Sequence, residues 1–133
     1  MDLRDDQLER YARHIVLKEI GGAGQVRLLG AHVTVIGAGG IGSPVLQYLA
    51  GAGVGHIRVI DDDVVDLSNL QRQTLFGIGD IGTPKAEAAM RAIARLNGDV
   101  SLVPINQRID GDNADMLLRH SDAPARLLRD QDN

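Results

Sequence analysis

Several residue types that decide the class of a protein are absent or scarce in this chain of 133 residues. It has no cysteine, so disulfides and thiolate metal sites are excluded within it. It has no tryptophan, one phenylalanine and two tyrosines, so its core must be built from aliphatic side chains. No apolar run approaches the roughly 18 residues that cross a membrane, and the N-terminal residues lack the apolar core of a signal peptide. These absences predict a cytoplasmic protein without a membrane segment.

Positive charge is also in deficit, since the formal net charge is −4. Proteins that bind nucleic acids or membrane surfaces present a basic face. The charge therefore argues against both classes of partner, and any recognition of phosphate must be local. The length allows one domain at most.

Residues 31–61 have the pattern of a dinucleotide-binding βαβ unit. The β-branched runs 33–36 and 57–60 predict two buried strands, and residues 43–50 between them can form a helix. A helix that follows a glycine turn offers unpaired N–H groups to an anion. The segment therefore predicts nucleotide binding, with a purely structural turn as the alternative.

The glycines of this turn have separate physical roles. Gly37 permits the tight turn, Gly39 lets the backbone approach a phosphate, and Gly42 lets the helix pack closely on the strand. Asp61 ends the second strand about 20 residues further on, near the spacing at which an acid reaches a ribose hydroxyl.

A polar loop follows the second strand. It has four aspartates within six residues, and such carboxylates repel one another unless a cation or hydroxyl groups bind them. Arg72 stands between two glutamines and can bind phosphate oxygens in bidentate fashion. A phosphate-binding loop and an exposed polar loop without a ligand both remain open.

The N-terminal pattern predicts a helix from about residue 5 to residue 20. Asp5 or Asp6 caps it, and Leu8 and Tyr11 belong to its apolar stripe. The pair Gly21-Gly22 ends this helix, and residues 25–29 form a short helical turn.

Thr83 and Pro84 predict the cap and the first residue of a helix that ends at Asn97-Gly98. Its expected buried face consists of Ala86, Ala89, Met90, Ile93 and Ala94. Lys85 lies in the first turn of this helix, where a cation opposes the helix dipole and is slightly unfavourable. Its position therefore indicates a nearby anion, although an exposed lysine without a ligand fits the sequence equally well. 

Residues 100–103 predict a third strand, and residues 113–120 predict a last helix. Asp112 caps this helix, and Met116 and Leu117 point inward.

Together these motifs resemble the ThiF-type adenylyltransferases, bacterial relatives of the ubiquitin-activating enzymes. The resemblance is closest to the enzymes of molybdopterin and thiamine biosynthesis and covers about residues 8 to 118. The matching segments are RYARH at 10–14, GAGGIGSPVLQYLAGAGVG at 37–55, DDDVVDLSNLQRQ at 61–73 and GTPKAEAA at 82–89.

The resemblance implies an enzyme that binds ATP and a small ubiquitin-like sulfur-carrier protein. Such enzymes join AMP to the C-terminal glycine carboxylate of the carrier and release pyrophosphate. It also implies a homodimer, in which Arg13 reaches into the site of the neighbouring subunit. The family uses Mg²⁺, whose usual aspartate is not identifiable here, and full-length members carry zinc, for which this cysteine-free chain has no site.

The resemblance implies catalytic roles for Arg13, Arg72 and Lys85. Gly40 would lie against the nucleotide, Asp61 would hold the ribose, and the polar loop and Lys85 would contact the phosphates. The expected nucleotide-binding residues are Gly37, Gly39, Gly40, Gly42, Asp61, Asp63, Ser68, Asn69, Arg72 and Lys85.

We expect an α/β fold with a Rossmann-like, partly parallel sheet and flanking helices, the N-terminal half of the family's fold. A helical segment, residues 1–30, precedes a truncated nucleotide-binding domain, residues 31–120, and a divergent tail, residues 121–133. In the tail, Pro124, Arg126 and Arg129 interrupt the buried strand with which the family continues.

Without that continuing strand, residues 33–36 would form an exposed sheet edge. We therefore expect a truncated or frameshifted form that is weak or inactive by itself. A non-catalytic nucleotide-binding or dimerisation module is the alternative, and an NAD-dependent oxidoreductase is a further one, against which the loop 62–73 argues.

Overall fold

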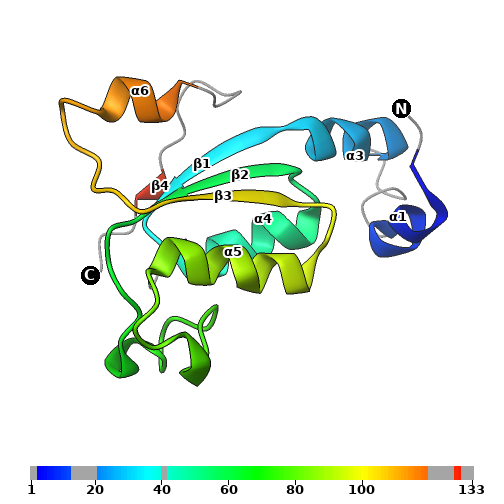
Figure 1. The fold of residues 1–133 in the computed structure, drawn as a ribbon. Coiled ribbons are helices and arrows are strands. Elements are labelled where there is room, and N and C mark those ends of the chain that lie inside the picture. The colour runs from blue at the N-terminus through cyan, green and yellow to red at the C-terminus, as the bar shows by residue number, and fades with distance from the viewer. Residues whose placement is uncertain (1–2, 13–20, 40–41, 120–127, 130–133) are drawn as a thin grey trace.

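The computed structural model describes residues 3–12, 21–39, 42–119 and 128–129. Within these residues, four parallel strands form one sheet in the order β3-β2-β1-β4, and helices α4 and α5 lie against the same face of it (Figure 1). The strands are β1 (His32–Ile36), β2 (His56–Ile60), β3 (Ser101–Ile105) and β4 (Leu128–Arg129). The helices are α1 (Asp5–Arg10), α3 (Gly21–Gly30), α4 (Gly42–Ala52), α5 (Lys85–Leu96) and α6 (Ala114–Leu118), with single 3₁₀ turns η1 (Leu67–Asn69) and η2 (Ile78–Asp80).

The register of the sheet places the carboxyl ends of its three long strands side by side. Ile36 of β1 lies opposite Ile60 of β2, which in turn lies opposite Ile105 of β3. The segments that follow β1 and β2 therefore leave the sheet at the same edge. This confirms the three strands and the helix α4 expected from the sequence, and every strand pair among the described residues is parallel.

The core lies between the sheet and the helices α4 and α5, and it is almost entirely aliphatic. Val35, Ile57 and Val59 of the sheet are at most 1% exposed, as are Leu46 of α4 and Ile93 of α5. Burial of such side chains contributes about 1.5–3 kcal/mol each. The aliphatic core that the scarcity of aromatic residues predicts is therefore present.

The predicted open edge at β1 is partly wrong. Leu128 pairs with Val35 and Arg129 with Ile36, so β4 covers the last two residues of β1. Backbone groups make these ladder bonds, so a polar side-chain pattern around Arg129 does not prevent them. Pro124 and Arg126 lie outside the described residues.

A polar network holds the N-terminal segment against the far end of α5. The hydroxyl of Tyr11 donates to Oδ2 of Asp99 at 3.0 Å and accepts from Nδ2 of Asn97 at 2.8 Å. The same Nδ2 donates to the carbonyl of Ala50 at 2.9 Å. Tyr11 is 1% exposed, and this burial raises the pKa of its hydroxyl.

The N-terminal helix differs from its prediction. Helix α1 ends at Arg10, and its N-cap is Arg4 rather than an aspartate. Its buried side is formed by Gln7, whose Oε1 accepts the N–H of Arg4 at 3.0 Å, and not by Leu8, which is 45% exposed. The expected stretch 13–20 lies outside the described residues.

The glycine pair at 21–22 begins a helix; whether another helix ends just before it falls on residues 13–20, outside the described residues. Gly21, with φ +59°, is the first residue of α3, which is longer than the expected turn at 25–29. The bond from Nε2 of Gln25 to the carbonyl of Ala52, at 2.9 Å, ties α3 to the end of α4. This tertiary contact explains how a glycine-rich segment is held in a helix.

Helix α5 begins one residue later than expected, with Pro84 as its N-cap instead of Thr83. Ala86, Ala88, Ala89 and Ile93 are buried, whereas Met90 and Ala94 are exposed. The buried face of α5 is therefore displaced from the predicted one, toward Ala88 and the buried Lys85.

Helix α6 is shorter than predicted and is capped by Asn113 instead of Asp112. Oδ1 of Asp110 accepts the backbone N–H groups of Asp112 and Asn113, so the chain turns before the helix starts. Leu117 is buried as expected, whereas Met116 is 59% exposed. Of the helices described, none is long and apolar enough to cross a membrane.

Candidate functional site

The glycine turn joins β1 to α4 at the carboxyl edge of the sheet. Gly37 has φ +91°, and its N–H donates to the carbonyl of Ile60 at 2.8 Å. Ser43 closes the turn, since its hydroxyl donates to the carbonyl of Ala38 at 2.9 Å and its N–H to that of Gly39 at 2.8 Å. A Cβ atom on Gly42 would collide with the carbonyl of Gly37. The tight turn expected at Gly37 and the close approach expected at Gly42 are both present.

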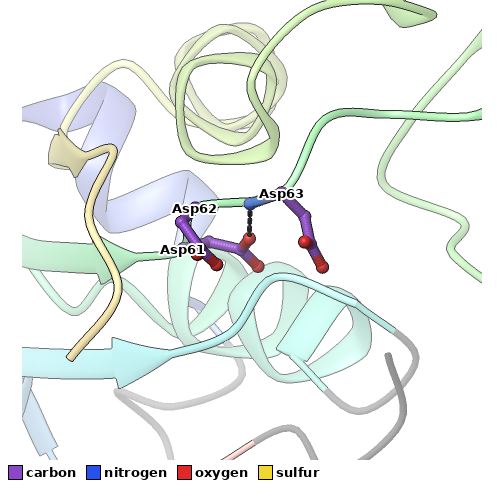
Figure 2. A group of neighbouring side chains, drawn as sticks. All are labelled: Asp61, Asp62 and Asp63. Carbon is purple, nitrogen blue, oxygen red and sulfur yellow. Dashed lines mark hydrogen bonds between the residues drawn. The ribbon is translucent and has the colours of Figure 1, made fainter. Parts of the chain in front are cut away.

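The carboxylate of Asp61 ties the end of β2 to this turn. Its Oδ2 accepts the N–H of Ala38 at 2.8 Å, and its Oδ1 accepts the N–H of Asp63 at 2.7 Å, the bond drawn in Figure 2. Burial raises the pKa of Asp61, while these two backbone bonds and the nearby Lys85 oppose that rise. Each carboxylate oxygen has more than one acceptor site, so the group can still accept a hydroxyl.

Lys85 lies beside this edge although it is distant in sequence from the glycine turn. Its backbone N–H donates to the carbonyl of Asp63 at 2.9 Å, and its Nζ lies 3.7 Å from Oδ2 of Asp63. The side chain of Lys85 is 3% exposed. The N–H of Val65 donates to the carbonyl of Thr83 at 2.9 Å and holds the two ends of the connection together. A buried cation and the glycine turn thus share the same edge of the sheet.

Three carboxylates gather where β2 ends. Asp61, Asp62 and Asp63 each offer an oxygen atom, and these atoms lie within 4.8 Å of one another (Figure 2). Carboxylate oxygens are ligands that Mg²⁺ prefers. Asp62 and Asp63 are exposed, whereas both oxygens of Asp61 already accept backbone N–H groups, so the set fits a cation that keeps several waters.

Ser68 and Asn69 are brought together around Asp66, a residue that the sequence did not single out. Oδ1 of Asp66 accepts the N–H of Leu67 at 2.9 Å, and Oδ2 accepts the hydroxyl of Ser68 at 2.8 Å. Oδ1 of Asn69 accepts the N–H of Asp66 at 3.1 Å. An aspartate followed three residues later by an amide is a capping pattern, and this signal could have identified Asp66.

Arg72 and Gln73 follow η1 and differ in exposure. Both backbone N–H groups donate to the carbonyl of Asn69, at 3.2 Å and 2.9 Å. The side chain of Arg72 is exposed, whereas that of Gln73 is fully buried. The sequence drew attention to Gln73 only as a neighbour of Arg72, and nothing local in the sequence signals its burial.

Two of the predicted site residues, Arg13 and Gly40, lie outside the described residues. Of the others, Asp61, Asp63 and Lys85 gather with the glycine turn, and Ser68 and Asn69 gather with Asp66. The exposed Arg72 follows this second group along the chain. The first group combines backbone donors at the start of a helix, a buried cation and a carboxylate acceptor. Such a set can bind a phosphate group and a neighbouring hydroxyl.

Comparison with known proteins gives a family match over most of the chain. The model of the ThiF family matches residues 11–125. The SAMP-activating enzyme E1 of Haloferax volcanii is 50% identical over 122 residues, which are 92% of this chain and 45% of that protein. The molybdopterin-synthase adenylyltransferase of Salmonella typhimurium is 46% identical over 111 residues, 84% of this chain and 45% of that protein.

Solved structures share the fold. The tRNA N6-threonylcarbamoyladenosine dehydratase of Escherichia coli, solved in complex with ATP, matches with a TM-score of 0.81 and 26% identity. The match covers 91% of this chain and 49% of that chain. The chain thus spans less than half the length of these relatives.

Proposed function

Because the chain belongs to the ThiF family, we propose that it contributes to an ATP-dependent adenylyltransferase. Its substrate is the C-terminal glycine of a ubiquitin-like sulfur-carrier protein, which is activated as an acyl-adenylate. The proposal is supported above all by the meeting of Asp61, Lys85 and the glycine turn at one edge of the sheet. Since the chain spans less than half the length of these relatives, we expect it to catalyse this reaction only weakly by itself.

The proposed reaction brings two anions together. A carboxylate oxygen of the carrier attacks the α-phosphorus of ATP, the new bond forms there, and the bond to the bridging oxygen of the β-phosphate breaks. The electron pair of that bond leaves with pyrophosphate. The site must therefore neutralise negative charge and align the reacting groups before the bond forms.

The residues of this chain supply donors for that purpose. We expect the N–H groups at the start of α4 to donate to a phosphate of ATP, and Gly40, which lies outside the described residues, to lie against the nucleotide. Lys85 and Arg72 balance the charge of the phosphates, and Asp61 accepts a ribose hydroxyl. Ser68 and Asn69 complete the phosphate contacts from η1.

Mg²⁺ supplies further neutralisation of phosphate charge when it is bound with ATP. Among the described residues, Asp62 and Asp63 would hold it through their exposed carboxylates. Asp63 also lies against Lys85 at 3.7 Å, so it positions the ammonium group near the same phosphates.

We also propose that the active form is a homodimer in which Arg13 of one subunit completes the site of the other. An arginine suits this role because its guanidinium group binds phosphate oxygens in bidentate fashion.

Exchange of labelled pyrophosphate into ATP tests the catalytic proposal. We expect exchange that depends on an added sulfur carrier and is lost in Lys85→Ala but not in Arg95→Ala, an exposed cation at the other end of α5. Nucleotide binding without any exchange would favour a non-catalytic module. A stronger thermal stabilisation by NAD than by ATP would favour an oxidoreductase.

A further inference from the structure

The side chain of Gln73 is buried without a polar partner among the residues that the structure describes. It is 0% exposed, and neither its Oε1 nor its Nε2 makes a hydrogen bond with any part of the chain that the structure describes. A buried donor or acceptor that is left unpaired shifts the folding equilibrium against the folded state by a factor of roughly 5 to 30. A methionine of similar size would avoid this cost, so the unliganded fold does not account for the amide.

The backbone around Gln73 is held firmly in place. Its N–H donates to the carbonyl of Asn69 at 2.9 Å, and its carbonyl accepts the N–H of Phe76 at 3.2 Å. The hydroxyl of the next residue, Thr74, donates to Oε1 of Gln47 on α4 at 3.1 Å. Gln47 lies in the second turn of α4, whose first turn follows the glycines. Gln73 therefore lies near the end of α4 at which a phosphate would bind.

The chemistry of the amide indicates which ligand group it can pair with. Phosphate oxygens only accept hydrogen bonds, so they would pair with Nε2 and leave Oε1 unpaired. Lys85 and Arg72 are donors only, and they already match phosphate. A peptide bond offers an N–H and a C=O, which satisfy both polar atoms of Gln73. An adenine edge also offers both, but in folds of this type the phosphate, and not the base, lies at the helix N-terminus.

We propose that Gln73 binds the main chain of the C-terminal tail of the carrier protein. The inference rests on the proposed function, because the terminal carboxylate of the tail must meet the α-phosphorus. The preceding peptide bonds of the tail then lie at the phosphate end of the site. The flanking Gln71, Arg72 and Thr74 are exposed, so the proposed contact requires the Gln73 side chain to rotate toward the surface on which these neighbours lie.

The variant Gln73→Met tests the proposal, with Gln71→Met as the matched control. Without ligands, we expect Gln73→Met to raise the thermal midpoint by about 3–8 °C, because two unpaired polar atoms are removed. The midpoint of the control should not move, since Gln71 is exposed.

Calorimetry then measures binding of a ubiquitin-like sulfur-carrier protein to protein saturated with a non-hydrolysable ATP analogue. The variant Gln73→Met should bind the carrier roughly 10- to 100-fold more weakly than the wild type, because two hydrogen bonds to the tail are lost. The affinity for the analogue should stay within about twofold of wild type, because no phosphate contact is lost.

Other outcomes overturn the proposal in distinguishable ways. A lower midpoint in Gln73→Met would mean that the amide is already paired, for example with a buried water. An equal loss of affinity for the analogue and the carrier would assign the amide to the nucleotide. Wild-type protein that does not bind the carrier would also overturn it. Wild-type protein that binds the carrier without pyrophosphate exchange would instead contradict the proposed catalysis and leave the tail contact standing.

Discussion

The substitution Lys85→Met separates a binding role of Lys85 from a structural one. Lys85 is 3% exposed and is the first residue of α5, where a cation opposes the helix dipole at a cost of about 0.3–1 kcal/mol. Its ion pair with Asp63 spans 3.7 Å, and Asp63 is 51% exposed, so the pair contributes less than about 1 kcal/mol. Methionine has a similar length and a similar helix propensity.

These magnitudes predict that the unliganded variant is at least as stable as the wild type. Removal of the buried ammonium group should raise the free energy of unfolding by up to about 1 kcal/mol. Affinity for ATP should fall, because a charge-assisted hydrogen bond contributes about 1.5–3 kcal/mol. That loss corresponds to binding that is roughly 10- to 100-fold weaker.

Urea denaturation and isothermal titration with ATP measure the two effects on the same protein. The matched control is Arg95→Met, in the last turn of the same helix, where the cation favours the dipole. It should lower the free energy of unfolding by about 0.3–1 kcal/mol and leave ATP binding unchanged. A Lys85→Met variant that loses stability but keeps its ATP affinity would refute the reasoning, since Lys85 would then serve only the ion pair with Asp63.

Three further substitutions give independent checks. Tyr11→Phe should lower the free energy of unfolding, measured by urea denaturation, by about 2–3 kcal/mol, because it removes a hydrogen bond to the charged Asp99. The control Tyr48→Phe, at a side chain that is 76% exposed, should change it by less than about 0.5 kcal/mol. Equal losses in the two variants would contradict the stabilising role of the hydrogen bonds around Tyr11. Because burial raises the pKa of Asp61, its carboxyl group releases its proton at a higher pH in the folded state than in the unfolded state. The wild type should therefore lose stability relative to Asp61→Asn as the pH rises above 3.8, the ordinary pKa of an aspartate. A stability difference between the two proteins that does not vary with pH would contradict the effect of burial on this pKa. Arg72→Ala should weaken binding of ATP much more than that of AMP in titration calorimetry, while equal losses would remove Arg72 from the polyphosphate contacts.

Local sequence patterns were sufficient for the strands β1, β2 and β3, for α4 and for the turn between β1 and α4. A β-branched run or a glycine at a tight turn acts through its own backbone preferences, so the pattern can be read without the rest of the fold. Gly37 and Gly42 are of this kind, because one needs a positive φ and the other has no room for a Cβ atom.

The same local patterns failed where a residue's environment is set by distant elements. Met90 has the right spacing for a buried residue of α5, yet it is exposed because the sheet and α4 contact only part of that helix face. Thr83 resembles a helix cap, but its carbonyl accepts the N–H of Val65 in the returning connection.

The sequence by itself determined the glycine turn, the aliphatic core and the family motifs, because each depends on the identity of neighbouring residues. Only the tertiary structure decided that Asp61 holds the N–H of Ala38, that Lys85 is buried against Asp63, and that Gln73 is buried without a polar partner among the described residues. These features depend on which distant segments the parallel register of the sheet brings to one edge. Hydrogen bonds and desolvation act over a few ångströms in space, whatever the separation of the residues along the chain.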